Sequence, residues 1–349
     1  MTASSQRKRL GFFSRVLDQT DAQTRYRLVG EQIIHAEKFG FDSAWLAQHH
    51  FNAEEGGLPA PLVLLADIAA RTSRIRLGTG VITLPMENPV RVAEDSAVLD
   101  LLSGGRLEVG FGTGGTPQAF LPFGLDSAER GPVYAGHLAT IRKAWSGGEL
   151  PGGNRLYPSA PTLGDRIWQA TFSVGGGERA GRDGDGLMLS RTQPRSADAP
   201  AAALWDLQNP IIDAYLAALP TGRTPRILGS RSLFVADDRK EALHLAEIGL
   251  QRSVERFRAS GFAIADQTTA GLIKAFDVHV GTPDDVIASL QADTALSRVT
   301  DLVFQVHSID PPHPYLLRSL ELIATEVAPV LGWSGKAVRP IERFNAATA

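Results

Sequence analysis

The fold of this chain is decided by residues Arg76 to Gly115, which read RLGTGVITLPMENPVRVAEDSAVLDLLSGGRLEVGFGTGG. A β-rich apolar run opens the stretch, a helix-periodic segment follows from Val90 to Leu102, and a second apolar run begins at Leu107. A short strand, a helix and another short strand form the unit that repeats around a buried parallel sheet. The stretch therefore predicts an α/β fold built from βα units.

The same alternation extends in both directions along the chain. Eight short runs are almost continuously apolar, which suits strands buried on both faces, and eight is the number that a closed (β/α)8 barrel needs. They begin near Leu10, Ser43, Ile75, Leu107, Ile167, Gly186, Leu228 and Asp301. Helices are expected at Tyr26 to Phe39, Val90 to Leu102, Ser127 to Trp145, Arg239 to Phe257 and Pro314 to Val330.

Two stretches exceed a minimal barrel. Gly147 to Asp165 is rich in glycine and proline and predicts an irregular or hairpin insertion, and Arg258 to Val280 predicts a second long connection with weak periodicity. Neither resembles a domain linker. Residues 1–349 are therefore predicted to form one TIM-barrel domain with two insertions. Just beyond the second insertion, Thr282 is expected to cap a helix that has Pro283 in its first turn.

The composition of the chain limits the classes of partner that we expect it to bind. The chain is 43% hydrophobic and 21% charged, and its formal net charge is -3. Without a broad positive field, the driving force for binding nucleic acid or an anionic membrane is absent, so we expect a small-molecule partner. There is no cysteine, which fits a reducing compartment, and the first residues lack the apolar region of a signal peptide. We expect a cytoplasmic protein without a membrane span or a metal site.

A glycine-rich segment follows the fourth predicted strand. Gly110 to Gly115 formally matches the dinucleotide pattern G-x-G-x-x-G, but no helix follows it at once and it lies in the middle of the chain. Two interpretations stay open. The segment is a tight turn at the end of a strand, or it is a loop whose bare backbone approaches a ring or a phosphate.

Two neighbouring histidines end the second predicted strand. His49 and His50 point to opposite faces of that strand, so they cannot bind one metal together, and one of them should face the mouth of the barrel. A lone histidine is more often a hydrogen-bonded core residue than a catalyst, but a position at the end of a strand brings the two interpretations level. An imidazole with a pKa near neutrality moves protons in either direction.

A second glycine run follows the fifth predicted strand. Ser173 to Gly177 precedes a short helix, the arrangement in which backbone N–H groups and the helix dipole hold a phosphate. A flexible loop is the alternative, but three consecutive glycines are rare in an ordinary turn. Arg130, near the start of an earlier helix, is a candidate countercharge, although an exposed helix arginine is the simpler interpretation.

Taken together, these residues resemble the luciferase-like flavin monooxygenases from about Leu10 to Leu331. The most specific stretch is Arg76 to Gly115, similar throughout to the family's third strand, LPxxxPVRxAED helix and GGRxxxGxGxG loop. The resemblance implies FMN at the carboxyl-terminal mouth of the barrel, with its phosphate near the fifth strand and its ring over the third and fourth. It also implies a cis peptide between Gly80 and Val81.

Carried over by position, the resemblance makes His49 the catalytic residue. The cofactor-binding residues that it implies are Gly80, Val81, Gly112, Thr113, Gly114, Arg130, Ser173, Val174, Gly175, Gly176, Met188 and Ser190. At the end of the sixth strand we expect Arg191 or Arg195 to bind an anionic group of the substrate. Bacterial luciferase has a cysteine and an arginine where this chain has Gly112 and Thr113, so light emission is not implied.

The function that follows from the resemblance is a monooxygenase that uses reduced FMN and O2 to oxidise a small organic substrate. A separate flavin reductase would supply the reduced FMN, and a homodimer is expected from relatives. Two rivals stay open: a deazaflavin-dependent hydride-transfer dehydrogenase on the same barrel, and a non-catalytic flavin-binding protein. A nicotinamide dehydrogenase built on Gly110 to Gly115 is disfavoured by the context of that loop.

Overall fold

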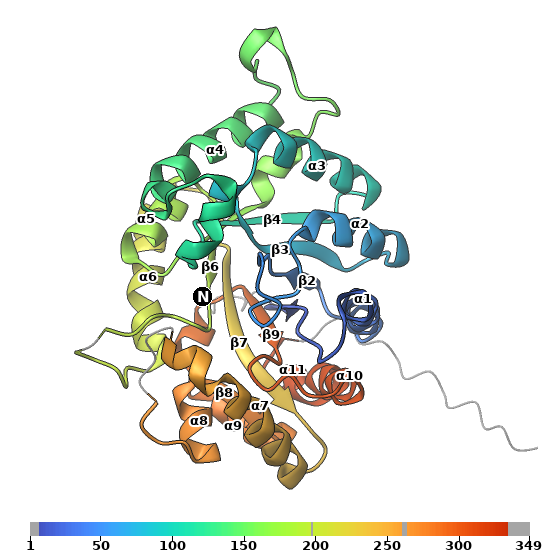
Figure 1. The fold of residues 1–349 in the computed structure, drawn as a ribbon, viewed down its shortest axis with the longest axis vertical. Coiled ribbons are helices and arrows are strands. Elements are labelled where there is room, and N and C mark those ends of the chain that lie inside the picture. Colours follow the sequence, from blue (N-terminus) through green and yellow to red (C-terminus); the bar gives the residue numbers. More distant parts are fainter. Residues whose placement is uncertain (1–6, 197, 260–263, 334–349) are drawn as a thin grey trace, which may run out of the picture.

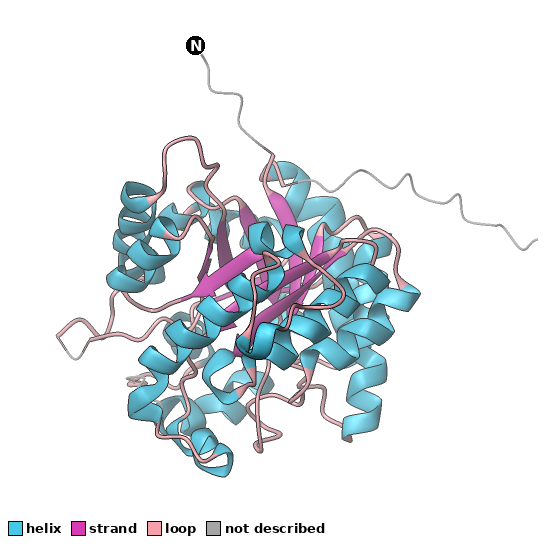
Figure 2. Ribbon diagram, turned by 90° about the horizontal axis from the view of Figure 1, so that it is seen from above, coloured by secondary structure: helices cyan, strands magenta, loops and turns pink. Residues whose placement is uncertain are grey.

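The computed structural model describes residues 7–196, 198–259 and 264–333. Its centre is a closed barrel of eight parallel strands surrounded by helices (Figure 1, Figure 2). The barrel strands are β1 (Arg9–Ser14), β2 (Ser43–Leu46), β3 (Arg76–Thr83), β4 (Leu107–Gly112), β5 (Ile167–Ala170), β6 (Gly186–Leu189), β7 (Ile227–Val235) and β9 (Asp301–Gln305). Pairing of β6 with β7 closes the ring. The predicted (β/α)8 barrel and all eight predicted strands are confirmed.

Helices connect the strands and cover the outside of the barrel. They are α1 (Ala22–Lys38), α2 (Pro61–Arg71), α3 (Pro89–Leu102), α4 (Arg130–Trp145), α5 (Val174–Arg182), α6 (Leu204–Ala218), α7 (Arg239–Ala259), α8 (Thr269–Ala275), α9 (Pro283–Gln291), α10 (His313–Leu322) and α11 (Ala328–Val330). The five helices predicted from periodicity are present, and so are the helices predicted at the Ser173 run and after Thr282, whereas α2, α6 and α8 were not predicted. None of the helices among the described residues has the length and apolarity needed to cross a bilayer.

The deciding stretch forms β3, α3 and β4 as expected. Asn88 caps α3, because its side chain accepts hydrogen bonds from the backbone N–H groups of Val90 (2.9 Å) and Arg91 (3.2 Å). The helix ends before Gly104 and Gly105, whose positive φ angles of 67° and 81° favour glycine. The chain then turns back into β4, which pairs in parallel with β3.

The two insertions differ from each other. Residues 147–165 form short 3-10 turns with one isolated bridge, and they project from the barrel in the irregular form that the sequence predicted (Figure 1). The prediction for residues 258–280 was incomplete. That connection contains α8 and a ninth strand, β8 (Val278–Gly281), which pairs with the second half of β7. Beyond it, Thr282 and Asp285 form a capping box at α9.

Large side chains fill the inside of the barrel beneath its carboxyl-terminal mouth. The rings of Trp45 and Trp168 meet edge to face with centroids 5.7 Å apart. The buried layer comprises Trp45, Trp168, Met188, Leu228 and Val303. Half-buried apolar side chains pack against this layer and form the floor of the mouth: Phe13, Val81 and Ala170. The barrel is therefore closed inside, and any ligand has to bind above this floor.

Candidate active site

The two histidines after β2 have different surroundings. His49 lies beside Arg15, with Arg15 Nη2 3.0 Å from His49 Nε2, whereas the His50 ring packs edge to face on Phe123 at 5.0 Å. A guanidinium only donates hydrogen bonds, so Nε2 of His49 accepts and its proton lies on Nδ1. That Nδ1 atom is buried without a partner among the described residues. It faces Gly56, where a Cβ would lie only 2.4 Å away.

The electrostatic environment of His49 differs from the sequence expectation. Burial lowers the pKa of His49 well below its usual range, and the charge of Arg15 lowers it further. The expectation that His49 titrates near neutral pH is therefore wrong for the ligand-free chain. A neutral imidazole at this place can accept a proton or position a hydrogen bond, but its remaining N–H group is too weakly acidic to act as a general acid.

The β3 and β4 ends form the glycine-rich part of the mouth. The peptide bond between Gly80 and Val81 is cis, as expected. A Cβ on Gly112 would lie 2.6 Å from a methyl group of Val81 and 3.9 Å from Ala170. The Val81 side chain, which is part of the floor, therefore packs directly against the backbone of β4 at Gly112. Gly114 has a φ of 83°, and a Cβ there would meet Thr83 and Phe120 at 2.7 and 2.9 Å.

The start of α5 is open at the mouth. Ser173 caps the helix by accepting a hydrogen bond from the backbone N–H of Gly176 at 3.2 Å, and residues 173–175 are exposed. A Cβ on Gly175 would meet nothing within 4 Å. By contrast, a Cβ on Gly176 would collide with Thr171, and one on Gly177 would collide with the backbone of α6. Close packing thus explains two of the three glycines, and only Gly175 lies at open space.

The other predicted cofactor contacts are spread over the same end of the barrel. Arg130 begins α4, is exposed and donates to the carbonyl oxygen of Ser127 at 3.4 Å. Ser190 is half-buried just after β6, where its hydroxyl lies 2.9 Å from that of Thr192. Met188 is buried in the layer beneath the floor. Met188 is therefore part of the buried core, and it lies beside Ala170 in the register of β5 and β6.

The two arginines expected to contact the substrate differ sharply. Arg195 forms an ion pair with Asp277 at 2.6 Å and donates to the carbonyl oxygen of Ala202, so partners within the chain account for its charge. Arg191 is only 2% exposed, and its Nη2 donates to the Ser308 hydroxyl at 3.2 Å. Its Nε and Nη1 atoms have no partner among the described residues. Arg191 is therefore the stronger candidate for binding an anion.

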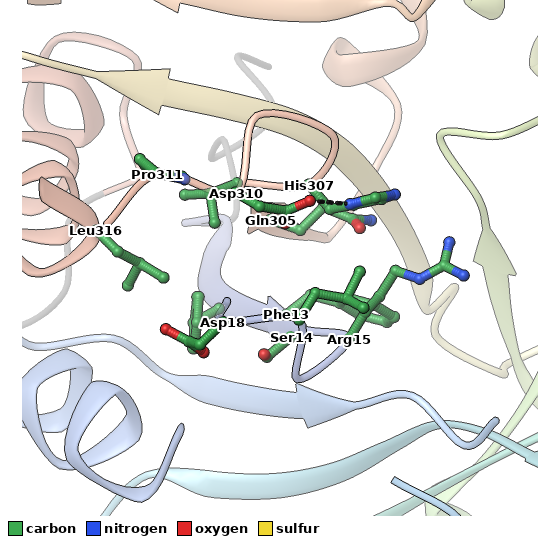
Figure 3. A pocket seen from close by; sticks show the side chains of 12 residues that line it. Phe13, Ser14, Arg15, Asp18, Gln305, His307, Asp310, Pro311 and Leu316 are labelled. Atoms are coloured by element: carbon green, nitrogen blue, oxygen red, sulfur yellow. Dashed lines mark hydrogen bonds and ion pairs between the residues drawn. The ribbon is translucent and has the colours of Figure 1, made fainter. Parts of the chain in front are cut away.

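Sequence reasoning missed four further residues of the mouth. Arg15 follows β1, His307 follows β9, and Arg256 lies near the end of α7. His307 Nδ1 lies 2.6 Å from the Asp310 carboxylate, and its Nε2 accepts from Arg256 at 2.9 Å. Arg15, His307 and Asp310 line one small cavity (Figure 3). The available signal was weak: a charged or imidazole side chain directly after a predicted strand.

Comparisons with known proteins agree with this geometry. Residues 10–300 match the family model described as luciferase-like monooxygenase. Limonene 1,2-monooxygenase of Rhodococcus erythropolis is 27% identical over 321 residues, which cover 86% of this chain and 80% of that protein. Several other curated relatives are matched over only about a third to a half of their length (30%, 39% and 48%).

Solved structures share the whole barrel. Monooxygenase RslO1 from Streptomyces bottropensis aligns with a TM-score of 0.74 and 26% identity over 93% of this chain and 99% of its own. The oxygenating constituent of 3,6-diketocamphane monooxygenase from Pseudomonas putida, solved with FMN, also aligns with a TM-score of 0.74, at 21% identity over 93% and 98% of the two chains. With its family model matched over most of its length, the chain belongs to the luciferase-like monooxygenase family.

Proposed function

We propose that this protein is a flavin-dependent monooxygenase that uses reduced FMN and O2 to oxidise a small organic substrate. The observation that carries the proposal is the open start of α5 at the mouth of the barrel. There residues 173–175 are exposed, a Cβ on Gly175 would meet nothing within 4 Å, and the positive end of the helix dipole lies at this open place. This arrangement suits the phosphate of FMN.

The rest of the mouth fits a flat ring above the floor. Phe13, Val81 and Ala170 offer an apolar surface, and Gly112 adds bare backbone beside it. A side chain at Gly112 would fill the space next to Val81 that a ring would occupy. The chemistry that bound reduced FMN supplies is the activation of O2 for oxygen transfer. The chain's own residues would orient the substrate, exclude water and manage protons.

His49 is proposed as the residue that handles the proton. Its low pKa keeps it neutral, and the Arg15 guanidinium fixes which nitrogen carries hydrogen. His49→Ala should leave FMN affinity within about threefold while suppressing product formation about 100-fold, the usual size of a lost acid–base group. His49→Asn, which keeps a hydrogen-bonding side chain, is the matched variant. Unchanged turnover in both variants would remove His49 from the mechanism.

The phosphate site is tested with two ligands that differ only there. Oxidised FMN and riboflavin are titrated into the full chain by calorimetry. We expect FMN to bind at least about tenfold more tightly, since charge-assisted hydrogen bonds contribute ~1.5–3 kcal/mol. Gly175→Val should remove that preference without weakening riboflavin. Equal affinities of FMN and riboflavin for the wild-type chain would overturn the phosphate assignment.

The rival cofactor and the rival role need separate measurements. A deazaflavin-dependent dehydrogenase would bind the deazaflavin cofactor in preference to FMN in the same titration. A non-catalytic flavin-binding protein would let its bound reduced flavin reoxidise without consuming any organic compound. The proposed monooxygenase requires a supply of reduced FMN, so a separate flavin reductase is its proposed partner. Its proposed location is the cytoplasm, which such a supply and the absence of cysteine suit.

A homodimer is proposed on the exposed apolar side chains of α2 and α3. Val63 and Leu102 are 74% and 66% exposed, and Val98 and Leu101 lie exposed on the same pair of helices (Figure 1). Large exposed apolar side chains on neighbouring helices are the kind that a protein interface covers. Leu102→Asp should convert a dimer into a monomer in sedimentation velocity. A wild-type chain that sediments as a monomer would contradict the proposal.

A further inference from the structure

Three arginines from distant parts of the sequence meet at one side of the mouth. Arg15 follows β1, Arg191 follows β6 and Arg256 lies in α7; we call them the mouth arginine cluster. Arg191 and Arg256 both place their guanidinium groups over the Phe257 ring, at 5.8 and 5.7 Å from its centroid. Burial lowers the pKa of His307, and the charges of all three arginines lower it further, so the three side chains act within one buried region.

Two members of the cluster have clear structural roles. Arg15 donates through Nε to the carbonyl oxygen of Glu55 at 2.8 Å, and Arg256 donates to the carbonyl oxygen of Glu54. Together they hold the loop that follows His49. These contacts are hydrogen bonds from arginine to carbonyl oxygens, which fix the positions of the two side chains at the mouth.

Arg191 has no comparable role. It is buried, it makes one hydrogen bond to Ser308, and its Nε and Nη1 atoms have no partner among the described residues. Burial and the nearby charge of Arg15 both lower the pKa of Arg191, which reports how unfavourable its charge is there. A buried guanidinium group whose Nε and Nη1 atoms lack hydrogen-bond partners is stabilised when an anion binds to it. The side chain is therefore prepared for a negatively charged ligand.

The negative charge present in this region does not balance the cluster. Among the described residues, the Asp310 carboxylate is the buried acid that interacts with all three arginines, and it already pairs with His307. Asp277, the next acid near Arg191, is engaged by Arg195. His307 accepts from Arg256, so its one proton lies toward Asp310 and it is neutral. Asp310 thus acts on several arginines at once, and within the described part of the chain no hydrogen bond joins a carboxylate to Arg191.

We propose that the mouth arginine cluster binds the carboxylate of the substrate, so that this monooxygenase acts on a small organic acid. The inference rests on the proposed function and adds the substrate class. A guanidinium group presents a planar fork that matches a carboxylate, and Phe257 and Phe13 supply apolar surface for the body of the molecule. The open start of α5 follows β5, whereas Arg191 follows β6 and Arg15 follows β1, so the proposal gives the substrate carboxylate and the FMN phosphate separate sites.

The test uses benzoate as the anionic probe and benzamide as its neutral counterpart. Each is titrated by calorimetry into the full chain, with and without saturating oxidised FMN, at constant ionic strength. We expect benzoate to bind the wild-type chain at least about tenfold more tightly than benzamide, because charge-assisted hydrogen bonds to a buried arginine are strong. Equal affinities of the two probes would overturn the proposal.

Variants locate the site. Arg191→Met keeps the length of the side chain and should weaken benzoate at least about tenfold, without changing benzamide. Arg191→Lys should recover part of that loss. Arg258→Met removes an exposed arginine from the same end of α7 and should leave benzoate affinity unchanged. If Arg191→Met does not fold, Arg256→Met carries the same expectation. Full benzoate affinity in the folded Arg191 or Arg256 variant would overturn the proposal.

The FMN arm separates this inference from the proposed function. If the wild-type chain binds benzoate but not FMN, the proposed cofactor is wrong and the anion site stands. If Arg191→Met loses FMN affinity more than tenfold while riboflavin binds as before, the cluster holds the cofactor phosphate and the inference falls. Unchanged FMN affinity together with weakened benzoate supports both conclusions.

Discussion

The two sides of the barrel mouth differ in the groups that they present: one side presents backbone, and the other presents long charged side chains. On the side of β3, β4 and β5, the chain offers bare backbone: the Gly80–Val81 peptide, Gly112, and the open start of α5. On the side of β1, β6 and β9, it offers long side chains with an excess of positive charge. His49, after β2, lies between the two sides and contacts Arg15.

Under the proposed function, this difference separates cofactor binding from substrate recognition within one site. Backbone groups cannot be exchanged without changing the fold, so they suit a cofactor that is the same in every turnover. Side chains are replaced by single substitutions, so they suit the recognition of a substrate that differs between relatives. Each side of the mouth should therefore respond to its own variants, and only changes beneath both should affect the two ligands together.

The largest effect is expected beneath the floor. Trp45 is 1% exposed and packs against Trp168, and a Cβ on Gly78 would lie 2.1 Å from its ring. Trp45→Ala should lower the free energy of unfolding by about 3–5 kcal/mol, as measured by urea denaturation. FMN and benzoate affinity should fall together. Loss of one ligand alone would show that the two sides do not share this support.

A smaller effect is expected on the backbone side. Gly112→Val should lower FMN affinity at least about tenfold, because overpacking against Val81 costs ~1–3 kcal/mol and takes the space beside the floor. Gly115→Ala is the matched control, since a Cβ there meets nothing within 4 Å. Benzoate affinity should stay within about threefold in both variants. A Gly112→Val chain that binds FMN normally would contradict the assigned ring position.

The contrast between the two sides also explains what the sequence could predict. The backbone side is formed by two continuous segments of sequence. Residues Arg76 to Gly115 contain β3, α3 and β4, with Asn88 as the cap of α3, and Ser173 to Gly177 contains the start of α5. Local patterns of glycine, caps and apolar period identify such segments. They also predicted all eight barrel strands, because a strand buried on both faces is apolar almost throughout.

The arginine side could not be predicted in the same way. Arg15, Arg191 and Arg256 are separated by long stretches of sequence, and no spacing connects them until the barrel closes. Arg195 and Arg191 were equivalent candidates, and only the ion pair with Asp277 distinguishes them. The low pKa of His49 is likewise a result of burial and of Arg15, neither of which is visible along the chain. Whether an arginine has an acidic partner depends on contacts between residues that are far apart in the sequence.

The smallest predicted effect is a pH dependence confined to the arginine side. Burial raises the pKa of Asp310 to about 6, against the opposing charges around it. The charged and titratable groups that act on Asp310 are Arg15, Arg191, Arg252, Arg256, His307 and Asp18. Burial and the surrounding arginines lower the pKa of His307 well below its usual range, so the change of charge expected near pH 6 is that of Asp310.

The sign of that dependence follows from the charge of Asp310. Below about pH 6 the carboxyl group takes up a proton, the region becomes more positive, and benzoate should bind about threefold more tightly at pH 5.5 than at pH 7.5. Asp310→Asn keeps an acceptor for His307 but removes the charge, so it should bind benzoate tightly at both pH values. FMN affinity, measured in the same buffers, should change less than benzoate affinity, because the proposed phosphate site is on the other side of the mouth. A benzoate affinity that rises with pH would show that the charge of Asp310 does not oppose the bound anion. An FMN affinity that changes with pH as much as the benzoate affinity would show that Asp310 acts electrostatically on both sides of the mouth.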